Sequence, residues 1–450
     1  MKKVSRRSFL KNTAMAAAVL NYIPFSIRGS NVPSNKLNIA AIGIGGMGGY
    51  NLKNCEDENI VALCDVDSDY AAGTIKRYPK AKVYKDYRLM LEKQRDIDAV
   101  IIATPDHTHA VITMAAMQEG KHVFCQKPLT HNLYEARKIT EAANYYNVQT
   151  QMGNQGHSVE HIRLLKEWIA DGAIGTVREV HAWTDRPVGG DPWSNFAVKA
   201  KSTENPPVPE TLDWDLWLGP APYRVYHPDY HPTKWRAWLD FGTGSLGDMG
   251  CHILDPAFYA LDLGAPDKLQ ATSTHWEPEI ESQTFPRASI VRFNFPANNK
   301  RDAVKLTWYD GRLLPEIPEE LEIGRELPSS GALIIGDKGA MLHGSHGADG
   351  VRLIPEAKMQ EYVRPPKTIP RVTEGHEGDW IRACKEGKSG RPASSNFNYG
   401  GPLTEMVLLG MIAIQVKDQR LEWNKDEMKF TNNEKANSLI KTQYRDGWKL

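Results

Sequence analysis

The chain has 450 residues, and at about 150 residues per domain this length favours two or three domains. Hydrophobic residues make up 41% of it and charged residues 24%, which excludes a disordered or fibrous protein. Lys plus Arg number 55, as do Asp plus Glu, so the neutral chain gives no sign of a nucleic-acid-binding surface. The five cysteines form neither a C-x-x-C pair nor a disulfide framework, so we expect buried free thiols.

Residues 1–35 are predicted to be a twin-arginine export signal. The sequence SRRSFLK at 5–11 contains the arginine pair, and a short apolar stretch follows at 13–25. A plain basic helix start is the alternative interpretation. The apolar stretch is interrupted by Asn21 and Pro24 and is shorter than the ~18 residues of a membrane span, which argues against a permanent membrane anchor. We therefore expect a periplasmic protein, exported in the folded state.

A dinucleotide-binding domain is predicted for residues 36–152. An apolar strand at 37–42 runs directly into GIGGMG at 43–48, a G-x-G-x-x-G motif between a strand and a helix. Glycine there permits a tight turn and close approach of a pyrophosphate, which the amides at the helix N-terminus attract. The next strand, 60–64, ends in Asp65, about 20 residues further on, where an acid binds the ribose hydroxyls. An acid at this position favours NAD over NADP.

Strands and helices continue to alternate after Asp65. We predict a helix at 133–146 and further strands at 98–103, 122–125 and 148–152. Such alternation is typical of a doubly wound parallel sheet, an α/β fold whose ligand-binding residues follow the carboxyl ends of the strands. In this chain the strand ends carry Asp65, Thr104, Pro105, Lys127 and Gln151.

A second domain is predicted for residues 153–450. Its expected strands lie at 177–183, 267–274, 288–294, 303–309 and 332–335, and loops rich in Pro, Gly, Asn or Glu lie at 186–212, 310–330 and 354–371. Helices are expected at 159–171, 375–386 and 403–415, and the last two are expected to pack against the first domain.

A helix after residue 244 is expected to place Asp248, His252 and Asp255 on one face, because they are spaced four and three residues apart. Helix-cap and core roles are one interpretation, and metal ligation by the three side chains is another. The third is catalysis. A histidine takes the proton of a carbohydrate hydroxyl that is being oxidised, an acid orients that histidine, and a lysine such as Lys127 stabilises the alkoxide.

Aromatic residues are dense between Trp214 and Phe241. We expect about half of them in the core and the rest available to stack on a sugar ring. The preferred pocket candidates are Asn154, Trp235, Arg236 and Tyr309. Four histidines are expected to be structural or at the surface: His157, His161, His227 and His231.

The glycine motif, ALCD at 62–65, QKP at 126–128 and GDMGCH at 247–252 together resemble the Gfo/Idh/MocA family of sugar and polyol oxidoreductases. The resemblance implies an N-terminal Rossmann domain and a C-terminal α/β domain. The large, open, mostly antiparallel sheet of that second domain often forms an oligomer interface. Members usually carry Glu where this chain has Gln126, which alters the electrostatics beside Lys127.

The motifs and the resemblance together give the candidate site residues, the resemblance supplying the catalytic positions, and we expect no metal among them. The catalytic set is Lys127, Asp248 and His252; the cofactor set is Gly43, Gly45, Gly46, Met47, Gly48, Asp65, Thr104, Pro105, His109, Gln126 and Lys127; the substrate set is Asn154, Trp235, Arg236, Asp248 and His252.

The favoured hypothesis is an NAD-dependent oxidoreductase acting on a hydroxyl-bearing sugar carbon during polysaccharide or oligosaccharide breakdown. Because free NAD is scarce outside the cytoplasm, the alternative is a glycosidase or lyase whose retained NAD oxidises the sugar transiently, permits elimination, and is regenerated. A nucleotide-binding scaffold without activity is the non-enzymatic hypothesis.

Overall fold

The structure is a computed structural model that describes residues 35–189, 195–197, 204–274 and 283–450. The predicted export signal therefore lies outside the described residues. Residues 37–450 form one compact unit that contains both predicted domains. The boundary predicted near residue 152 follows directly on the last strand of the first sheet.

Six parallel strands form the first sheet, in the order β3-β2-β1-β4-β5-β6. They are β1 (Asn38–Ile42), β2 (Asn59–Cys64), β3 (Lys82–Tyr84), β4 (Ala99–Ile102), β5 (His122–Cys125) and β6 (Thr150–Met152). This order is that of a dinucleotide-binding fold and confirms the predicted doubly wound sheet. Strand β3 escaped prediction because its three residues lie at the edge and two of them are exposed.

Helices cover both faces of this sheet, so its strands are apolar on both sides. On β1, Ile39 and Ala41 pack into one core cluster, whereas Ala40 and Ile42 pack into the other. The covering helices are α2 (Gly46–Lys53), α3 (Ala72–Arg77), α4 (Tyr87–Lys93), α5 (Asp106–Gln118) and α6 (Leu133–Tyr146). Helix α6 has the predicted bounds, and a reciprocal cap between Asn132 and Glu135 begins it.

The second sheet has nine strands in the order β13-β12-β11-β7-β10-β9-β8-β14-β15. The predicted strands are β7 (Val177–Trp183), β8 (Lys268–Ser273), β9 (Ser289–Phe295), β10 (Val304–Tyr309) and β11 (Gly331–Gly336). The others are β12 (Gly339–Gly344), β13 (Arg352–Ile354), β14 (Leu421–Asn424) and β15 (Lys429–Phe430). Only β7 and β10 pair in parallel, so the expected mostly antiparallel sheet is confirmed.

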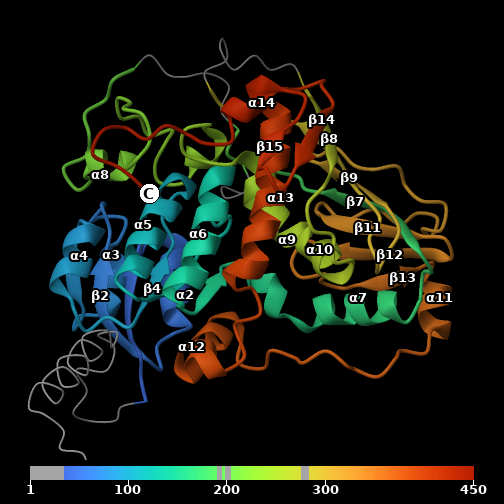
Figure 1. Cartoon of the computed structure of the whole chain (residues 1–450), viewed down its shortest axis with the longest axis horizontal. Coiled ribbons are helices and arrows are strands. Elements are labelled where there is room, and N and C mark those ends of the chain that lie inside the picture. The colour runs from blue at the N-terminus through green and yellow to red at the C-terminus, as the bar shows by residue number, and fades with distance from the viewer. Residues whose placement is uncertain (1–34, 190–194, 198–203, 275–282) are drawn as a thin grey trace, which may run out of the picture. The chain divides into compact units, whose positions relative to one another are not determined.

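One face of the second sheet is covered by helices. On the opposite face Leu321, from the loop after β10, packs with the buried Leu333 and Leu342, and this face is more exposed along β10. Along β10 the buried side chains Val304, Leu306 and Trp308 alternate with less buried ones such as Lys305 and Thr307. The covered face meets α13 (Phe397–Gln415), which also packs against α6 of the first domain and against α9 (Gly244–Ile253) (Figure 1). Helix α13 begins before the predicted residue 403, because Asn396 caps it at Phe397.

The remaining helices belong to the second domain, and α7 links the two sheets along the chain. They are α7 (Glu160–Ala170), α8 (Trp214–Leu218), α10 (Asp255–Ala260), α11 (Glu356–Glu361), α12 (His376–Glu386) and α14 (Glu434–Ser438), with short 3₁₀ turns at Gln155–Ser158, Lys234–Ala237 and Gly387–Ser389. Strand β13 and helix α11 occupy part of the predicted loop at 354–371, which corrects that prediction.

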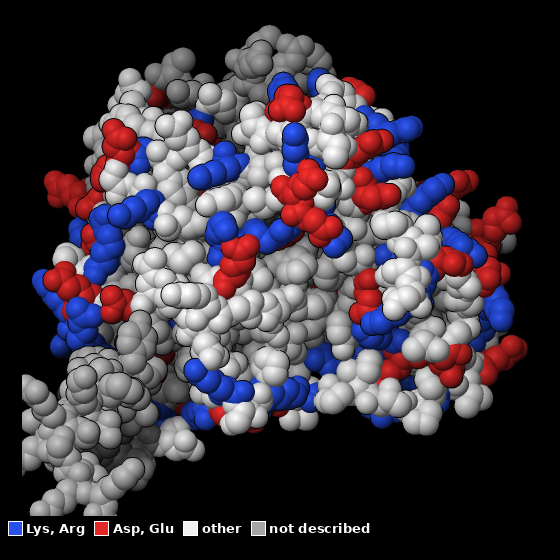
Figure 2. Space-filling model, viewed as in Figure 1, with Lys and Arg blue, Asp and Glu red and all other residues white. Residues whose placement is uncertain are grey.

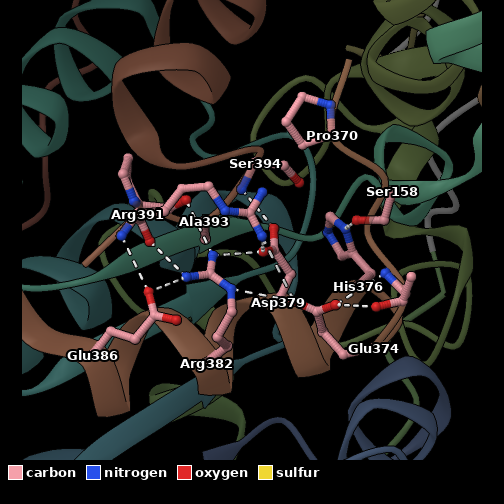
Figure 3. Close-up of polar contacts among 12 residues, drawn as sticks. Ser158, Pro370, Glu374, His376, Asp379, Arg382, Glu386, Arg391, Ala393 and Ser394 are labelled. Carbon is pink, nitrogen blue, oxygen red and sulfur yellow. Dashed lines mark hydrogen bonds and ion pairs between the residues drawn. The ribbon is translucent and has the colours of Figure 1, made fainter. Parts of the chain in front are cut away.

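Buried polar contacts hold helix α12, some of them within the second domain (Figure 3) and others to the first domain. The fully buried carboxylate of Asp379 accepts hydrogen bonds from Arg382 at 2.7 Å and from the backbone amide of Ser394 at 2.6 Å. On the same helix, His376 bonds the carbonyl of Met152 at 2.7 Å and so ties α12 to β6. The second domain therefore returns to the first through α12 and α13.

The distribution of surface charge and the hydropathy of the helices are those expected from the composition. On the face drawn in Figure 2, basic and acidic side chains are interspersed and no large patch of one sign appears. Among the described residues no helix combines the length and apolarity needed to cross a bilayer, and no cluster of His, Cys, Asp and Glu is arranged to hold a metal ion. All five cysteines are free and buried, as predicted.

Candidate active site

The loop after β1 requires glycine for two reasons: a positive φ angle and backbone atoms too close to admit a Cβ. Gly43 has a φ of 75°, and a Cβ there would lie 2.8 Å from the backbone of Ala103 and Thr104. A Cβ on Gly48 would lie 1.8 Å from the carbonyl oxygen of Gly43. The loop and the first turn of α2, which holds Gly46, Met47 and Gly48, therefore leave exposed backbone that a phosphate group can approach.

Asp65 follows β2 and faces this loop. Its carboxylate accepts hydrogen bonds from the backbone amides of Ile44 at 2.8 Å and Asp67 at 3.0 Å. Burial raises the pKa of Asp65, and these amide bonds act in the opposite direction. Asp65 thus holds the glycine loop in shape, a role that the sequence analysis did not include beside the predicted ribose contact.

A cavity of about 790 Å³, including the part open to solvent, lies at the carboxyl ends of β1, β2 and β4. Five predicted cofactor residues line it: Gly43, Gly45, Asp65, Thr104 and Pro105. The position and the donors fit a dinucleotide, because the glycine loop and the acid after β2 meet in one cavity.

Several lining side chains were not among the predicted site residues; Tyr70, Trp217 and His231 are three of them. The ring of Tyr70 would clash with a Cβ on Gly45, 2.2 Å away, and it meets His231 edge-on at 5.6 Å. His231 bonds Asp67 at 2.8 Å, and this bond lowers the pKa of Asp67 although burial opposes it. His231, expected to be structural or at the surface, is thus a wall of the cavity, and no local sequence signal marks it.

His109 and Gln126, predicted to bind cofactor, are buried side chains that do not line the cavity. The two ring nitrogens of His109 lie 2.8 Å from the carbonyl oxygens of Thr104 and Pro128. The Gln126 amide donates to Asn51 at 2.9 Å. Both therefore fix the strand ends that carry Thr104 and Lys127.

Asp248 is the centre of a buried charge cluster between the domains. Lys127, at the end of β5, donates to its carboxylate at 3.0 Å and also to its carbonyl oxygen. Arg186 binds the same carboxylate closely, and Arg236 approaches it at 3.3 Å. Burial by itself would raise the pKa of Asp248, but the three cations together hold it well below its ordinary range. The structure thus brings two predicted catalytic residues into direct contact.

His252 lies one turn after Asp248 on α9, only 5% exposed, and its Nδ1 has no hydrogen-bond partner among the described residues. Burial lowers its pKa well below the ordinary value, with Lys127 and His346 adding to the shift, so the imidazole is neutral at pH 7. The ring of His346 lies 4.3 Å away, centroid to centroid. Because Asp248 bonds the three cations and not His252, the expectation that this acid orients the histidine is wrong.

Asp255 does not share the face of Asp248 and His252. Helix α9 ends at Ile253, and Asp255 starts a separate helix, α10, after Leu254. Its carboxylate instead bonds His157 at 3.0 Å and Asn154 at 3.1 Å. Asn154, predicted to bind substrate, is fully buried and also accepts from Ser395 at 2.7 Å, so the structure places it in a packing contact rather than in a pocket.

Trp235 and Arg236 connect the cavity to the charge cluster. Trp235 lines the cavity, and the guanidinium of Arg236 lies 4.3 Å from the centre of its ring while also meeting Asp248. Tyr309 lies elsewhere, on β10, where its hydroxyl meets His181 at 3.1 Å. Most of the aromatic residues between 214 and 241 form one buried cluster, more than the half that we expected.

Comparison with known proteins identifies the protein family to which this chain is similar. Residues 37–154 match the NAD-binding Rossmann fold of an oxidoreductase family, and residues 159–281 match the C-terminal α/β domain of the same family. The fold and the site thus define a two-domain, NAD-binding oxidoreductase-type protein. The chain belongs to the Gfo/Idh/MocA family.

The curated relatives are dehydrogenases of sugars or polyols. A levoglucosan dehydrogenase from Pseudarthrobacter phenanthrenivorans is 25% identical over 223 residues, which cover 49% of this chain and 47% of that protein. An inositol 2-dehydrogenase from Rubrobacter xylanophilus is 31% identical over 156 residues, 33% of this chain and 44% of that protein. The chain thus spans about half the length of the curated relatives that it matches.

Solved structures share the fold over most of both chains. An inositol dehydrogenase homologue from Azotobacter vinelandii, complexed with NADH and myo-inositol, gives a TM-score of 0.55 at 18% identity and covers 87% of this chain and 98% of that one. The levoglucosan dehydrogenase complex with NADH gives 0.54 at 19% identity, covering 85% and 98%. At these identities the likeness establishes the fold alone.

Proposed function

We propose that the protein is an NAD-dependent oxidoreductase that transfers a hydride between the cofactor and a hydroxyl-bearing carbon of a sugar or sugar derivative. The observation that carries this proposal is the neutral, buried His252 beside Lys127 and Asp248, in a cluster that Arg236 and Trp235 join to the cavity. Family membership and relatives named for sugar and polyol oxidation support it.

Residues of the glycine loop, Asp65 and Thr104 would hold NAD, and when bound it supplies the acceptor for the hydride that leaves the carbon. His252 takes the hydroxyl proton, because its imidazole is neutral and its Nδ1 is unpaired. Lys127 stabilises the negative charge that develops on the oxygen, since its ammonium is held in place by Asp248. The C–H bond breaks with its electron pair, the O–H bond loses its proton, and the carbon becomes a carbonyl.

Breakdown of polysaccharides or oligosaccharides is the setting that we propose for this reaction, and export by the twin-arginine route is part of the same proposal. The support for export is the arginine pair at Arg6 and Arg7. Replacing both with lysine should retain the protein in the cytoplasm of a host with this pathway; periplasmic recovery of that variant would contradict the proposal. The more exposed part of the sheet face opposite the helices, along β9 and β10, is proposed to pair two copies, and sedimentation at low micromolar concentration tests this.

The test of the reaction is single-turnover reduction of NAD by the purified protein with a panel of monosaccharides, sugar acids, cyclitols and oligosaccharides. Formation of NADH in step with a carbonyl product supports the proposal. No NADH with any member of the panel, from protein shown to bind NAD, would contradict it. Release of a free sugar from an oligosaccharide without net NADH would instead favour the retained-cofactor hypothesis.

A further inference from the structure

One wall of the cavity comes from the far end of the sequence. We propose that residues 439–450, here called the strap, complete the adenosine half of the cofactor site and that the indole of Trp448 binds the adenine ring. This inference rests on the proposed binding of NAD. It assigns a cofactor-binding residue in the strap, outside both stretches that match the family.

The strap is fixed to the first domain at several points. The backbone amide of Tyr134 donates to the carbonyl of Ile440 at 3.0 Å, and the hydroxyl of Tyr444 donates to the buried carboxylate of Glu135 at 2.6 Å. These bonds attach the strap to the first turn of α6. Both contacts are buried or partly buried, so they fix the path of the strap along the first domain.

Arg445 anchors the next part of the strap to α8. Its guanidinium donates to the carbonyl of Gly219 and to the carboxylate of Asp215, both at 2.6 Å. Its backbone amide donates to the carbonyl of Pro220 at 3.1 Å. A fourth bond runs from the guanidinium to the carbonyl oxygen of Asp215. Only two residues separate this anchor from Trp448, so the anchor restricts how far the indole can move from the cavity.

Trp448 reaches the cavity over the start of α4. Its ring lies 6.5 Å from that of Tyr87, tilted by 38°, and the guanidinium of Arg88 lies 4.9 Å from its centre. The indole is partly buried and lines the cavity together with Tyr87, Asp86 and Asp65. An aromatic ring held in place beside a largely apolar cavity is suited to stacking on a base.

The sheet order identifies the half of the cofactor that Trp448 would meet. The cavity residues nearest Trp448 in the fold follow β2 and β3, at the edge of the sheet that begins β3-β2-β1. Lys127 follows β5, on the other side of β1 and β4, and does not line the cavity. In a dinucleotide-binding sheet the acid after β2 marks the adenosine ribose, so the strap covers the adenosine side and the charge cluster serves the nicotinamide side.

Stacking of a base on an aromatic side chain contributes about 1–3 kcal/mol, which corresponds to a Kd roughly 5-fold to 150-fold higher when the ring is removed. We therefore expect Trp448→Ala to raise the Kd for NAD and for ADP-ribose by at least ~5-fold. Trp448→Phe should recover part of this loss, because it keeps an aromatic face. Affinity for nicotinamide mononucleotide should stay within twofold, since that fragment lacks adenine.

Calorimetric titration of the full-length protein with the three ligands measures these effects. Lys449→Ala is the matched control, because this exposed neighbour does not line the cavity and its removal should leave every Kd unchanged. Hydrogen exchange gives a readout independent of activity: ADP-ribose should slow exchange in residues 443–449 of the parent protein. Far-UV circular dichroism and thermal unfolding establish that each variant is folded.

The outcomes are distinct. Weaker NAD and ADP-ribose binding in Trp448→Ala with partial recovery in Trp448→Phe supports the inference. Equal Kd values for the parent and Trp448→Ala would overturn it while leaving the proposed function intact. A parent protein that binds neither NAD nor ADP-ribose would overturn both. Should Trp448→Ala not fold, Arg445→Ala, which removes the anchor at Asp215 without touching the cavity, must weaken ADP-ribose binding in the same way or the inference fails.

Discussion

Removing the ammonium of Lys127 should abolish most of the hydride-transfer rate and leave the fold intact. In Lys127→Met a straight apolar side chain of similar length replaces the lysine, whose side chain is 14% exposed. Asp248 keeps its contacts with Arg186 and Arg236, so the buried carboxylate is still compensated. We therefore expect a stability loss below the ~3–5 kcal/mol that follows when a buried charge is left without a partner.

The expected rate loss follows from electrostatics. Two unit charges about 4 Å apart interact by roughly 4 kcal/mol at an effective dielectric constant near 20. Loss of that interaction with the developing alkoxide corresponds to a rate about 10³-fold lower, within the 10²–10⁴ range of positioned acid–base groups. Lys127 does not line the cavity, so the Kd for NAD should change by less than threefold.

Stopped-flow measurement of NADH formation in a single turnover, with a saturating sugar from the active panel, gives the rate directly. Lys138→Met is the matched control, because Lys138 is an exposed lysine of the same domain paired with Glu141 at the surface. Asp248→Asn is the contrasting variant. It leaves three cations without their carboxylate and should lower the midpoint of urea unfolding far more than Lys127→Met does. If Lys127→Met reduced NAD at the parent's rate, the cluster would be structural and the assignment of Lys127 would be refuted.

Three further predictions concern cofactor choice, pH–rate behaviour and stability. Asp65→Ala should raise the Kd for NAD more than tenfold and make the protein less selective for NAD over NADP. The variant loses the acceptor for the ribose hydroxyls and also the bonds to Ile44 and Asp67. An unchanged Kd in calorimetry would contradict this prediction. Because burial lowers the pKa of His252, the single-turnover rate should be independent of pH above pH ~6.5 and fall only at lower pH. If the same fall at low pH persisted in His252→Gln, this histidine could not be the base. Burial lowers the pKa of His376 to about 4, so the folded state resists protonation and stability falls as the pH drops from the unfolded-state value of ~6.5 towards 4. Between pH 7 and pH 5 this histidine should account for a loss of ~2 kcal/mol. Urea unfolding at the two pH values should show this difference in the parent and lack it in His376→Gln, whereas an equal pH dependence in both would contradict the assignment.

Much of this protein follows from local sequence. Strand β1, the loop at Gly43 and the acid at Asp65 were predictable because a tight turn that admits a phosphate requires glycine at fixed spacing. Helix α6 and strand β7 have the predicted bounds, since their caps and their hydrophobic periods are local properties of the chain.

Tertiary structure alone decided the composition of the site. Asp248 was identified from its motif, but its partners Arg186 and Arg236 come from other segments, and three cations around one carboxylate leave no local pattern in the sequence. The separation of Asp255 from His252 follows from the break between α9 and α10, which spacing alone could not reveal. Trp448 reaches the cavity only because bonds to α6 and α8 route the strap over α4, contacts between residues hundreds of positions apart. Local propensity determines elements, whereas long-range packing determines which side chains those elements bring together.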